Sequence, residues 1–331
     1  MDGLLIIDKP QGLSSHDAVA RARRLLREKR IGHAGTLDPL ATGVLVLCVG
    51  QATRLSEYLL GEDKAYEGVI KLGERTTTDD AEGEVIAAHP VPTISQADLR
   101  RLEVRFTGEI EQVPPQFSAI QRGGQRAYAL ARKGEQVALE PRRVTVYELQ
   151  LAPLDDPRSM TDHSEPSSVI RESEVGGRGA LPVGHLAVRV RCSAGTYIRA
   201  LARDIGEALG CGAHLVALRR TQSGRFTLAD AVSLDQLEAA AREGQAESLL
   251  LPMDRAVAGW PAAYLSHEEA RRLKLGQMII PARALVPPAQ AQGGVKVRVY
   301  DSQHTFFAIA CWDGTKLKPI KVFDAAPPLV R

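Results

Sequence analysis

The sequence predicts a mixed α/β (α+β) protein with two units, and three observations support this prediction. The length of 331 residues corresponds to about two domains. In the first part of the chain, apolar runs of strand length alternate with segments of helical period. Beyond about residue 252, short strands and tight turns follow one another, which is typical of a small β-barrel. We therefore expect a larger domain over 1–251 and a small domain over 252–331.

The composition is that of a globular protein outside a membrane. Hydrophobic residues make up 44% of the chain and the mean hydropathy is −0.14. The longest apolar run, 43–50, is far shorter than the roughly 18 residues that span a bilayer. No basic segment precedes a long apolar stretch at the N-terminus. We therefore expect no secretory signal, no membrane segment and a cytoplasmic location.

Total charge and cysteine usage exclude some classes of site. Lys and Arg number 42 against 40 Asp and Glu, so only the distribution of charge can reveal a nucleic-acid binder. The four cysteines lie far apart and form no C-x-x-C, which excludes a disulfide framework and an ordinary cysteine zinc site. The eight histidines form no H-x-x-x-H pattern, and we predict no metal site.

The N-terminal segment predicts a strand and then a capped helix. Leu4 to Ile7 is a short apolar strand that a turn at Gly12 closes. Ser14 and Asp17 have the spacing of a capping box for a helix over about 17–29. The outer face of this helix is basic: Arg21, Arg23, Arg24, Arg27, Lys29 and Arg30. Such a face is usually only solvated, but its place beside the motif of the next paragraph favours a phosphate contact.

Residues 32–43 form a loop rich in Gly, Thr and Pro before the buried strand Val44 to Val49. Asp38 precedes Pro39 in this loop. An Asp before Pro often starts a turn, which alone would explain it. A carboxylate on a rigid loop backed by a buried strand can equally face a cleft. The residues alone favour neither explanation. A second strand is predicted at Ala65 to Leu72, before an acidic turn.

A basic segment spans 113–147 and opens with Pro114-Pro115. Six bases oppose two Glu, so it carries about four net positive charges, and Phe117 and Tyr128 add aromatic surface suited to nucleic acid. The bases are Arg122, Arg126, Arg132, Lys133, Arg142 and Arg143. The next segment, 155–183, is acidic and rich in Ser, Pro and Gly without any period, so we predict a mobile surface insertion away from RNA.

Further elements follow in order. Leu186 to Cys192 alternates as a half-buried strand. After the turn at Gly195, apolar residues at helical spacing predict a helix with Arg199 and Arg203 on one face, which stops at Gly210 or Gly212. In the small unit we expect a helix from Ser266 to Leu275 and strands at Val295 to Val299 and Phe306 to Trp312.

Seven motifs, in order, resemble those of the bacterial tRNA pseudouridine-55 synthases of the TruB type. The most distinctive is Gly32-His33-x-Gly35-x-Leu37-Asp38-Pro39-x-Ala41-x-Gly43. The others are Asp8-Lys9-Pro10-x-Gly12-x-Ser14-Ser15, Lys64-Ala65-Tyr66, Gly73-x-x-Thr76-x-Thr78-x-Asp80-x-x-Gly83, Pro114-Pro115-x-Phe117-Ser118-Ala119, Cys192-Ser193-x-Gly195-Thr196-Tyr197-Ile198-Arg199, and Gly212-Ala213-His214 with Leu218-Arg219-Arg220-Thr221. The resemblance covers about residues 1 to 250, and the small unit resembles a PUA domain on weaker patterning.

The resemblance implies a pseudouridine synthase fold. Its central sheet is mixed, mainly antiparallel and flanked by helices, with an inserted RNA-contacting loop at about 113–147 and a PUA-like RNA-binding β-barrel at 252–331. The implied partner is the T-arm of tRNA, bound by a monomer without an obligate protein partner. The reaction moves ribose C1′ from uracil N1 to C5 and exchanges no other atoms, so no cofactor is expected.

The resemblance also assigns roles. Asp38 is the catalytic carboxylate, acting as a nucleophile or at the ribose, and Arg199 is its partner, because the guanidinium fork suits a carboxylate. Tyr66 stacks on the flipped uracil and removes the C5 proton. The expected substrate-binding residues are His33, which fills the gap left by the base, Tyr197 and Leu218 at the pocket floor, Lys9, which supports the loop, and Arg122, Arg126 and Lys133 on the basic segment.

Each residue taken singly has a purely structural explanation, and the ordered set decides against it. Two other functions stay open. One is an RNA-binding or tRNA-folding module whose catalysis is dispensable, which the basic segment and the PUA-like unit would suit. The other is the catalytic subunit of a guide-RNA particle, against which the inserted segment 113–147 argues.

Overall fold

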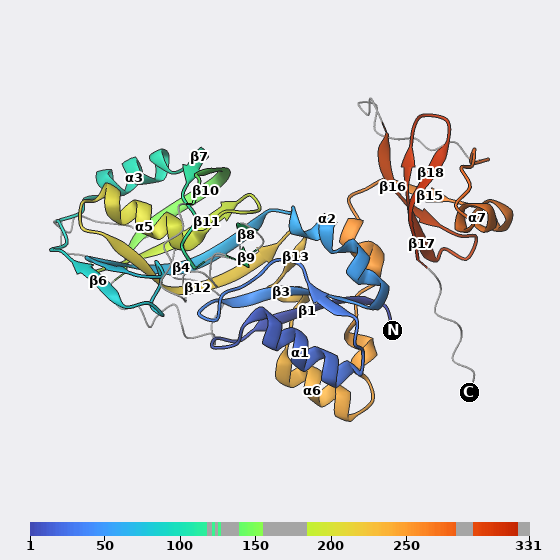
Figure 1. Ribbon diagram of the computed structural model, residues 1–331, viewed down its shortest axis with the longest axis horizontal. Helices are drawn as coiled ribbons and strands as arrows, with labels where there is room; N and C mark the ends of the chain where they lie inside the picture. Colours follow the sequence, from blue (N-terminus) through green and yellow to red (C-terminus); the bar gives the residue numbers. More distant parts are fainter. Residues whose placement is uncertain (118–120, 123–124, 127–138, 155–183, 283–293, 324–331) are drawn as a thin grey trace.

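The computed structural model describes residues 1–117, 121–122, 125–126, 139–154, 184–282 and 294–323. Within them, a ten-stranded sheet forms the larger unit, and its main path is β14-β1-β3-β12-β4-β11-β10-β7 (Figure 1). The pairs β1–β14 and β3–β12 are parallel, and the other pairs along the path are antiparallel. The expected mixed, mainly antiparallel sheet is therefore confirmed.

The elements of the larger unit follow in chain order. The strands of the large sheet are β1 (Gly3–Lys9), β2 (Ile31–His33), β3 (Thr42–Val49), β4 (Lys64–Leu72), β7 (Gly108–Gln112), β10 (Arg142–Leu154), β11 (His185–Cys192), β12 (Ala213–Ser223), β13 (Phe226–Thr227) and β14 (Val232–Ser233). The α-helices are α1 (Ser15–Leu26), α2 (Ser56–Leu60), α3 (Gln96–Arg105), α5 (Ile198–Ala208) and α6 (Leu234–Arg242). Two short ladders pair β5 (Glu74–Thr76) with β6 (Val85–Ala88) and β8 (Gln121–Arg122) with β9 (Gln125–Arg126).

The capping box at the start of α1 is confirmed: the Ser14 side chain accepts from the backbone N–H of Asp17, and the Asp17 side chain accepts from that of Ser14. The helix ends earlier than expected, at Leu26, because Arg27 adopts a left-handed conformation with φ 53°. Two of the basic residues on this helix serve the fold. Arg21 pairs with Asp235 and Glu238 of α6, and Arg23 donates to the carbonyl of Ile31.

Strand β3 is buried on both sides, which explains its unbroken apolar sequence. Leu45 and Leu47 face the main core, whereas Val44 and Val46 face a second core on the opposite side. One correction concerns the preceding loop: Ile31–His33 is not irregular but pairs with β3 as strand β2. Helices α1, α3, α5 and α6 all contribute to the main core, and so do Leu37 and Leu40 of the loop after β2. The loop that carries Asp38 therefore lies on the helix-covered face of the sheet.

The small unit is a four-stranded sheet with one helix, at one end of the large sheet in Figure 1. Its elements are β15 (Ala262–Tyr264), α7 (His267–Lys274), β16 (Val295–Tyr300), β17 (Phe306–Trp312) and β18 (Leu317–Val322). The predicted cap at Ser266 is present. Ile309 and Phe323 join the second core of the larger unit, and Leu251 still pairs with Leu4 of β1. The division at 251/252 and the closure of this sheet into a barrel stay predictions.

Part of the basic segment, including Lys133, and the whole predicted insertion 155–183 lie outside the described residues. For Arg122 and Arg126, the structure gives the backbone only, in β8 and β9. None of the described helices is long and apolar enough to cross a membrane.

Candidate active site

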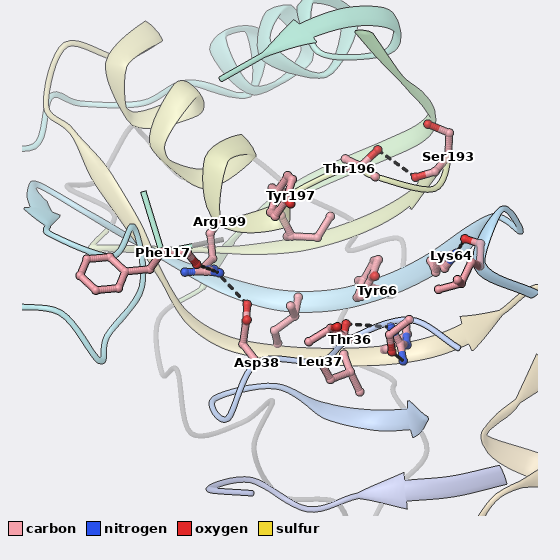
Figure 2. Close-up of a pocket in the computed structure, with 16 residues that line it drawn as sticks. Thr36, Leu37, Asp38, Lys64, Tyr66, Phe117, Ser193, Thr196, Tyr197 and Arg199 are labelled. Atoms are coloured by element: carbon pink, nitrogen blue, oxygen red, sulfur yellow. Dashed lines mark hydrogen bonds and ion pairs between the residues drawn. The ribbon is translucent and has the colours of Figure 1, made fainter. Parts of the chain in front are cut away.

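A cavity of about 270 Å³ opens between the loop that follows β2, strands β4 and β12, and the start of α5 (Figure 2). It brings together five of the predicted residues from distant parts of the chain: Asp38, Tyr66, Tyr197, Arg199 and Leu218. The sequence motifs therefore converge on one site.

The Asp38 loop is held by the N-terminal motif. The Ser15 hydroxyl accepts from the Leu37 N–H at 2.8 Å and donates to the Leu37 carbonyl at 3.0 Å. The Gly12 N–H donates to the carbonyl of Pro39 at 2.8 Å. These contacts flank Asp38 on both sides, so its backbone is fixed before any substrate arrives. The resemblance of residues 8–15 to a family motif thereby gains a physical reason.

Arg199 stands in the first turn of α5 and reaches Asp38, as predicted. Its Nε lies 2.9 Å from Asp38 Oδ2, and its Nη1 lies 3.3 Å from Asp80 Oδ2. The side chain of Arg199 is 7% exposed and that of Asp38 is 38% exposed. The expected fork on a single carboxylate is therefore wrong: the guanidinium is shared between two carboxylates. Asp38 keeps an accessible face toward the cavity.

The remaining donors of Arg199 bind the turn before Asp80 and the start of the basic segment. Nη1 donates to the carbonyl of Thr78 and Nη2 to that of Phe117, both at 3.0 Å. Asp80 is itself 2% exposed and accepts from the Thr78 hydroxyl at 2.5 Å. This buried carboxylate was not singled out from the sequence, although it occupies a fixed place in the quoted Gly73 to Gly83 motif.

Arg199 and Arg203, predicted to share one face of α5, both contact the turn that contains Asp79 and Asp80. One helical turn after Arg199, Arg203 donates through Nη1 to Asp79 Oδ2 at 3.0 Å and through Nη2 to the Val113 carbonyl at 2.8 Å. Successive carboxylates, Asp79 and Asp80, thus each take one arginine of the same helix face. The double contact fixes α5 against the turn and sets the direction of Arg199.

Opposing effects act on the Asp38 carboxyl. Burial raises the pKa of Asp38, and the nearby Asp80 carboxylate acts in the same direction. The Arg199 guanidinium and the Lys9 ammonium oppose this shift in pKa, because both favour the ionised form. Removal of either cation should therefore raise the pKa of Asp38 further.

Tyr66 lies in β4 with its phenol in the cavity wall. The residue is 8% exposed, and burial raises the pKa of its hydroxyl while the Arg220 guanidinium opposes that shift. Leu218 lies on the neighbouring strand β12, directly opposite Gly68. Tyr197 precedes α5, and its backbone N–H donates to Gln112 Oε1 at 2.8 Å. An aromatic ring, an aliphatic side chain and a carboxylate thus line one cavity.

Two predicted residues whose side chains the structure describes do not line the cavity. His33 lies in β2 and contacts His16 edge to face, with ring centroids 5.3 Å apart. Lys9 is fully buried and donates to the carbonyls of Pro10 and Leu13 at 2.9 and 2.6 Å. These contacts support the loop-supporting role expected of Lys9.

Two basic cavity residues were quoted within motifs but given no role. Lys64 and Arg220 are basic, yet they are 7% and 1% exposed. Arg220 follows the core residue Leu218 by two positions in β12, so the two share one face of the strand. A charged residue at a core position is rare unless it has partners, so it marks a place to search.

Comparisons with known proteins agree with this site. Residues 23–198 match the family "TruB family pseudouridylate synthase (N terminal domain)". Residues 199–258 match "tRNA pseudouridylate synthase B C-terminal domain", and residues 261–323 match "Pseudouridine synthase II TruB, C-terminal". The matches together span nearly all of the chain that follows the N-terminal motif.

Curated relatives are similar along most of their length. The tRNA pseudouridine synthase B of Ralstonia pickettii is 44% identical over 325 residues, which cover 96% of this chain and 92% of that protein. That of Cupriavidus pinatubonensis is 46% identical over 302 residues, covering 91% and 87%. Among solved structures, a chain of a Cbf5–Nop10–Gar1 complex aligns with a TM-score of 0.68 at 24% identity, covering 97% of this chain and 85% of that one. This last likeness concerns the fold.

Proposed function

Because this chain belongs to the TruB family of pseudouridine synthases, we propose that it isomerises the uridine at position 55 in the T-loop of tRNA. The enzyme is an isomerase of this family. The observation that carries the proposal is the pairing of Asp38 with Arg199 at the wall of a cavity that Tyr66 also lines. These are the groups that the reaction requires: an ionised carboxylate, a cation that holds it, and an aromatic ring for the base.

The reaction breaks the bond from C1′ to N1 and forms one from C1′ to C5. N1 gains a proton, C5 loses one, and nothing else enters or leaves. In this proposal, Asp38 attacks the uracil ring or ribose C1′, and the bond from C1′ to N1 breaks, which frees the base to turn. The bond to Asp38 breaks again when the nucleoside is restored with C1′ joined to C5. Arg199 keeps the Asp38 carboxylate ionised and directed at the nucleoside. No cofactor takes part in these steps.

Tyr66 has two roles in the proposal. Its ring stacks on the flipped uracil, and its phenolate oxygen accepts the C5 proton after the new bond has formed. Tyr197 and Leu218 close the floor on either side of the base. A base that is still stacked within an RNA helix cannot enter a cavity of about 270 Å³, so the target has to flip out first. His33 fills the place that the base leaves.

Binding of the T-arm rests on positive surfaces outside the cavity. On and after α1, the basic residues without a structural contact described above are exposed: Arg24, Arg27, Lys29 and Arg30. We assign them, with Arg122, Arg126 and Lys133 of the basic segment, to phosphate contacts. The folded shape of the T-arm then provides specificity. We place the protein in the cytoplasm and propose that it acts as a monomer without a protein partner.

The direct test uses two tRNA transcripts that differ only at position 55. The parent transcript carries uridine there, and the control carries cytidine, while all other uridines stay in place. The proposal predicts one pseudouridine per molecule in the first transcript and none in the second. Modification of the control at another uridine would contradict the T-loop assignment while leaving the family membership intact.

The RNA-folding alternative makes a different prediction. A module whose catalysis is dispensable would restore tRNA folding or tRNA-dependent growth equally well with Asp38→Ala in place of Asp38. The guide-RNA alternative predicts that the purified chain modifies tRNA only when a guide RNA is added. Modification by the purified chain alone supports the proposal against this second alternative.

A further inference from the structure

Arg220 is the largest side chain that is fully buried in the described part of the molecule, at 1% exposure. Its guanidinium donates to three backbone carbonyls: Nε to Val44 at 2.7 Å, Nη2 to Gly35 at 3.2 Å and Nη1 to Thr36 at 3.4 Å. The last two carbonyls belong to the loop that presents Asp38. A charged donor that holds two successive carbonyls restricts the course of this loop just before the carboxylate.

The backbone of the same residue contacts the other end of the loop. In the sheet, Arg220 lies opposite Gly43, where β3 begins. Gly43 has φ +98°, and a Cβ at this position would lie 2.2 Å from the Arg220 carbonyl oxygen. Only glycine permits both the conformation and the approach. One residue therefore contacts the loop on both sides of Asp38, by its side chain at 35–36 and by its backbone at 43.

On its other side, Arg220 lies opposite Tyr66 of β4. Residues directly opposite on paired strands have their Cβ atoms within about 4.5–5.5 Å, so the two side chains are neighbours on one face of the sheet. Arg220 thus lies between the loop that carries Asp38 and the strand β4, which carries Tyr66, the proposed general base. Strand β12 pairs with β3, which follows the Asp38 loop, on one side and with β4 on the other.

We propose that Arg220 is a positioning residue that fixes the Asp38 loop relative to Tyr66, and that its charge acts on the Tyr66 hydroxyl. The inference rests on the proposed roles of Asp38 and Tyr66. The arginine itself touches backbone and the phenol and is not assigned a contact with the reacting atoms. Contacts with the bound nucleoside are assigned to Asp38, Tyr66, Tyr197 and Leu218.

The charge of Arg220 has no carboxylate partner within ion-pair distance among the residues that the structure describes. The nearby Lys64 likewise donates to carbonyls, those of Leu60 and Glu62 at 2.8 and 2.5 Å. The titratable or charged groups that act on Tyr66 are Arg220, which lowers its pKa, and Cys192 and Asp38, which raise it. Burial raises the pKa of Cys192 to about 11, so its thiol is neutral at ordinary pH. Arg220 is therefore the group that favours release of the Tyr66 proton.

The test compares Arg220→Lys and Arg220→Gln with the parent enzyme under single-turnover conditions on tRNA labelled with tritium at uridine C5. Lysine keeps the charge and loses the fork, so we expect the rate constant to fall by about 10- to 100-fold through misplacement of the loop. Glutamine also loses the charge. We expect a lower rate still. We also expect the alkaline rise of the rate with pH, which reports ionisation of Tyr66 and is separate from the acid limb of Asp38, to move to higher pH, because the pKa of Tyr66 rises.

Both variants should bind tRNA with the affinity of the parent, since Arg220 is buried away from the phosphates. Arg189→Lys is the matched control. Arg189 lies in β11, on the far side of β4 from β12, and pairs with Glu67, whose side chain points to the opposite face from Tyr66. Its rate and pH profile should equal those of the parent. Melting temperatures establish that each variant is folded at the assay temperature, and either folded variant suffices for the comparison.

A folded variant with the parent's rate and pH profile would overturn this inference and leave the proposed function standing. A lower rate with an unmoved pH profile in Arg220→Gln would overturn the part that assigns its charge to Tyr66. A parent enzyme that releases no tritium would overturn the proposed function, and the inference with it.

Discussion

Asp38 and Arg199 meet with 2.9 Å between Oδ2 and Nε, although a loop near the N-terminus and a helix from the second half of the domain supply them. The cation is buried and the carboxylate is open to the cavity. Arg199 is also anchored by Asp80 and two carbonyls. Its contact with Asp38 at the cavity is drawn in Figure 2. The pair therefore differs from a fully buried structural salt bridge, because Arg199 is fixed while Asp38 stays accessible from the cavity.

Arg199→Lys should act as a severe substitution. The planar guanidinium contacts two carboxylates and two carbonyls at once, and the ammonium of lysine cannot make all four contacts. The Asp38 carboxylate is then no longer held in one orientation. We expect the single-turnover rate to fall by about 100-fold with tRNA affinity unchanged. Parallel measurements of rate and of tRNA binding check this. An unchanged rate would argue that the Asp38–Arg199 pair has no part in the reaction.

The single-turnover rate should fall as the pH is lowered, and this fall should begin at a higher pH than it would for an aspartate with an ordinary pKa. Asp38 must be ionised to act, and burial raises its pKa above the usual value of about 3.9. As pH falls through this raised pKa, the carboxylate is protonated and the reaction slows. Arg199→Met removes a cation that favours ionisation, so its acid limb should lie at still higher pH. Single-turnover rates on folded tRNA across this range are the measurement, and identical limbs for the two proteins would contradict it.

The sequence predicted which residues meet at the site better than the arrangement of the residues that support them. Asp38, Tyr66 and Arg199 were predicted from motifs, and the structure brings them to one cavity. The division of Arg199 between Asp38 and Asp80 could not be predicted, because it depends on how α5 packs on the turn at 77–83. Similarly, the left-handed Arg27 that ends α1 and the pairing of Ile31–His33 with β3 are set by tertiary contacts. Local patterns carry no record of such contacts.

Lys9 should make stability depend on pH in alkaline solution. Burial lowers its pKa from 10.5 to about 8. Between these two values the unfolded chain binds a proton that the folded chain does not, so stability from this group rises with pH across that window. Lys9→Met should remove the rise. The free energy of unfolding in urea, measured for both proteins from about pH 8 to 10.5, tests it, and parallel curves would refute the assignment.

Neutralisation of the basic segment should weaken tRNA binding in a salt-dependent way. The triple variant Arg122→Gln, Arg126→Gln, Lys133→Gln removes three proposed phosphate contacts. Each lost contact should reduce the slope of log K against log salt by about 0.7–0.9. The exposed arginines of α3 (Arg100, Arg101 and Arg105) supply a matched triple variant of equal charge change. If both triple variants lost affinity equally, only general positive charge would matter.

The C5 proton provides the most direct test of the central claim, that Asp38 carries out an isomerisation on tRNA. We would mix tRNA labelled with tritium at uridine C5 with the parent enzyme and with Asp38→Asn, and measure released tritium, the modified position and tRNA affinity. We expect one equivalent to be released from the T-loop by the parent and none by Asp38→Asn, at equal affinity. Release by Asp38→Asn at the parent's rate would contradict the role of Asp38, and tight binding without release by the parent would make the protein an RNA-binding module.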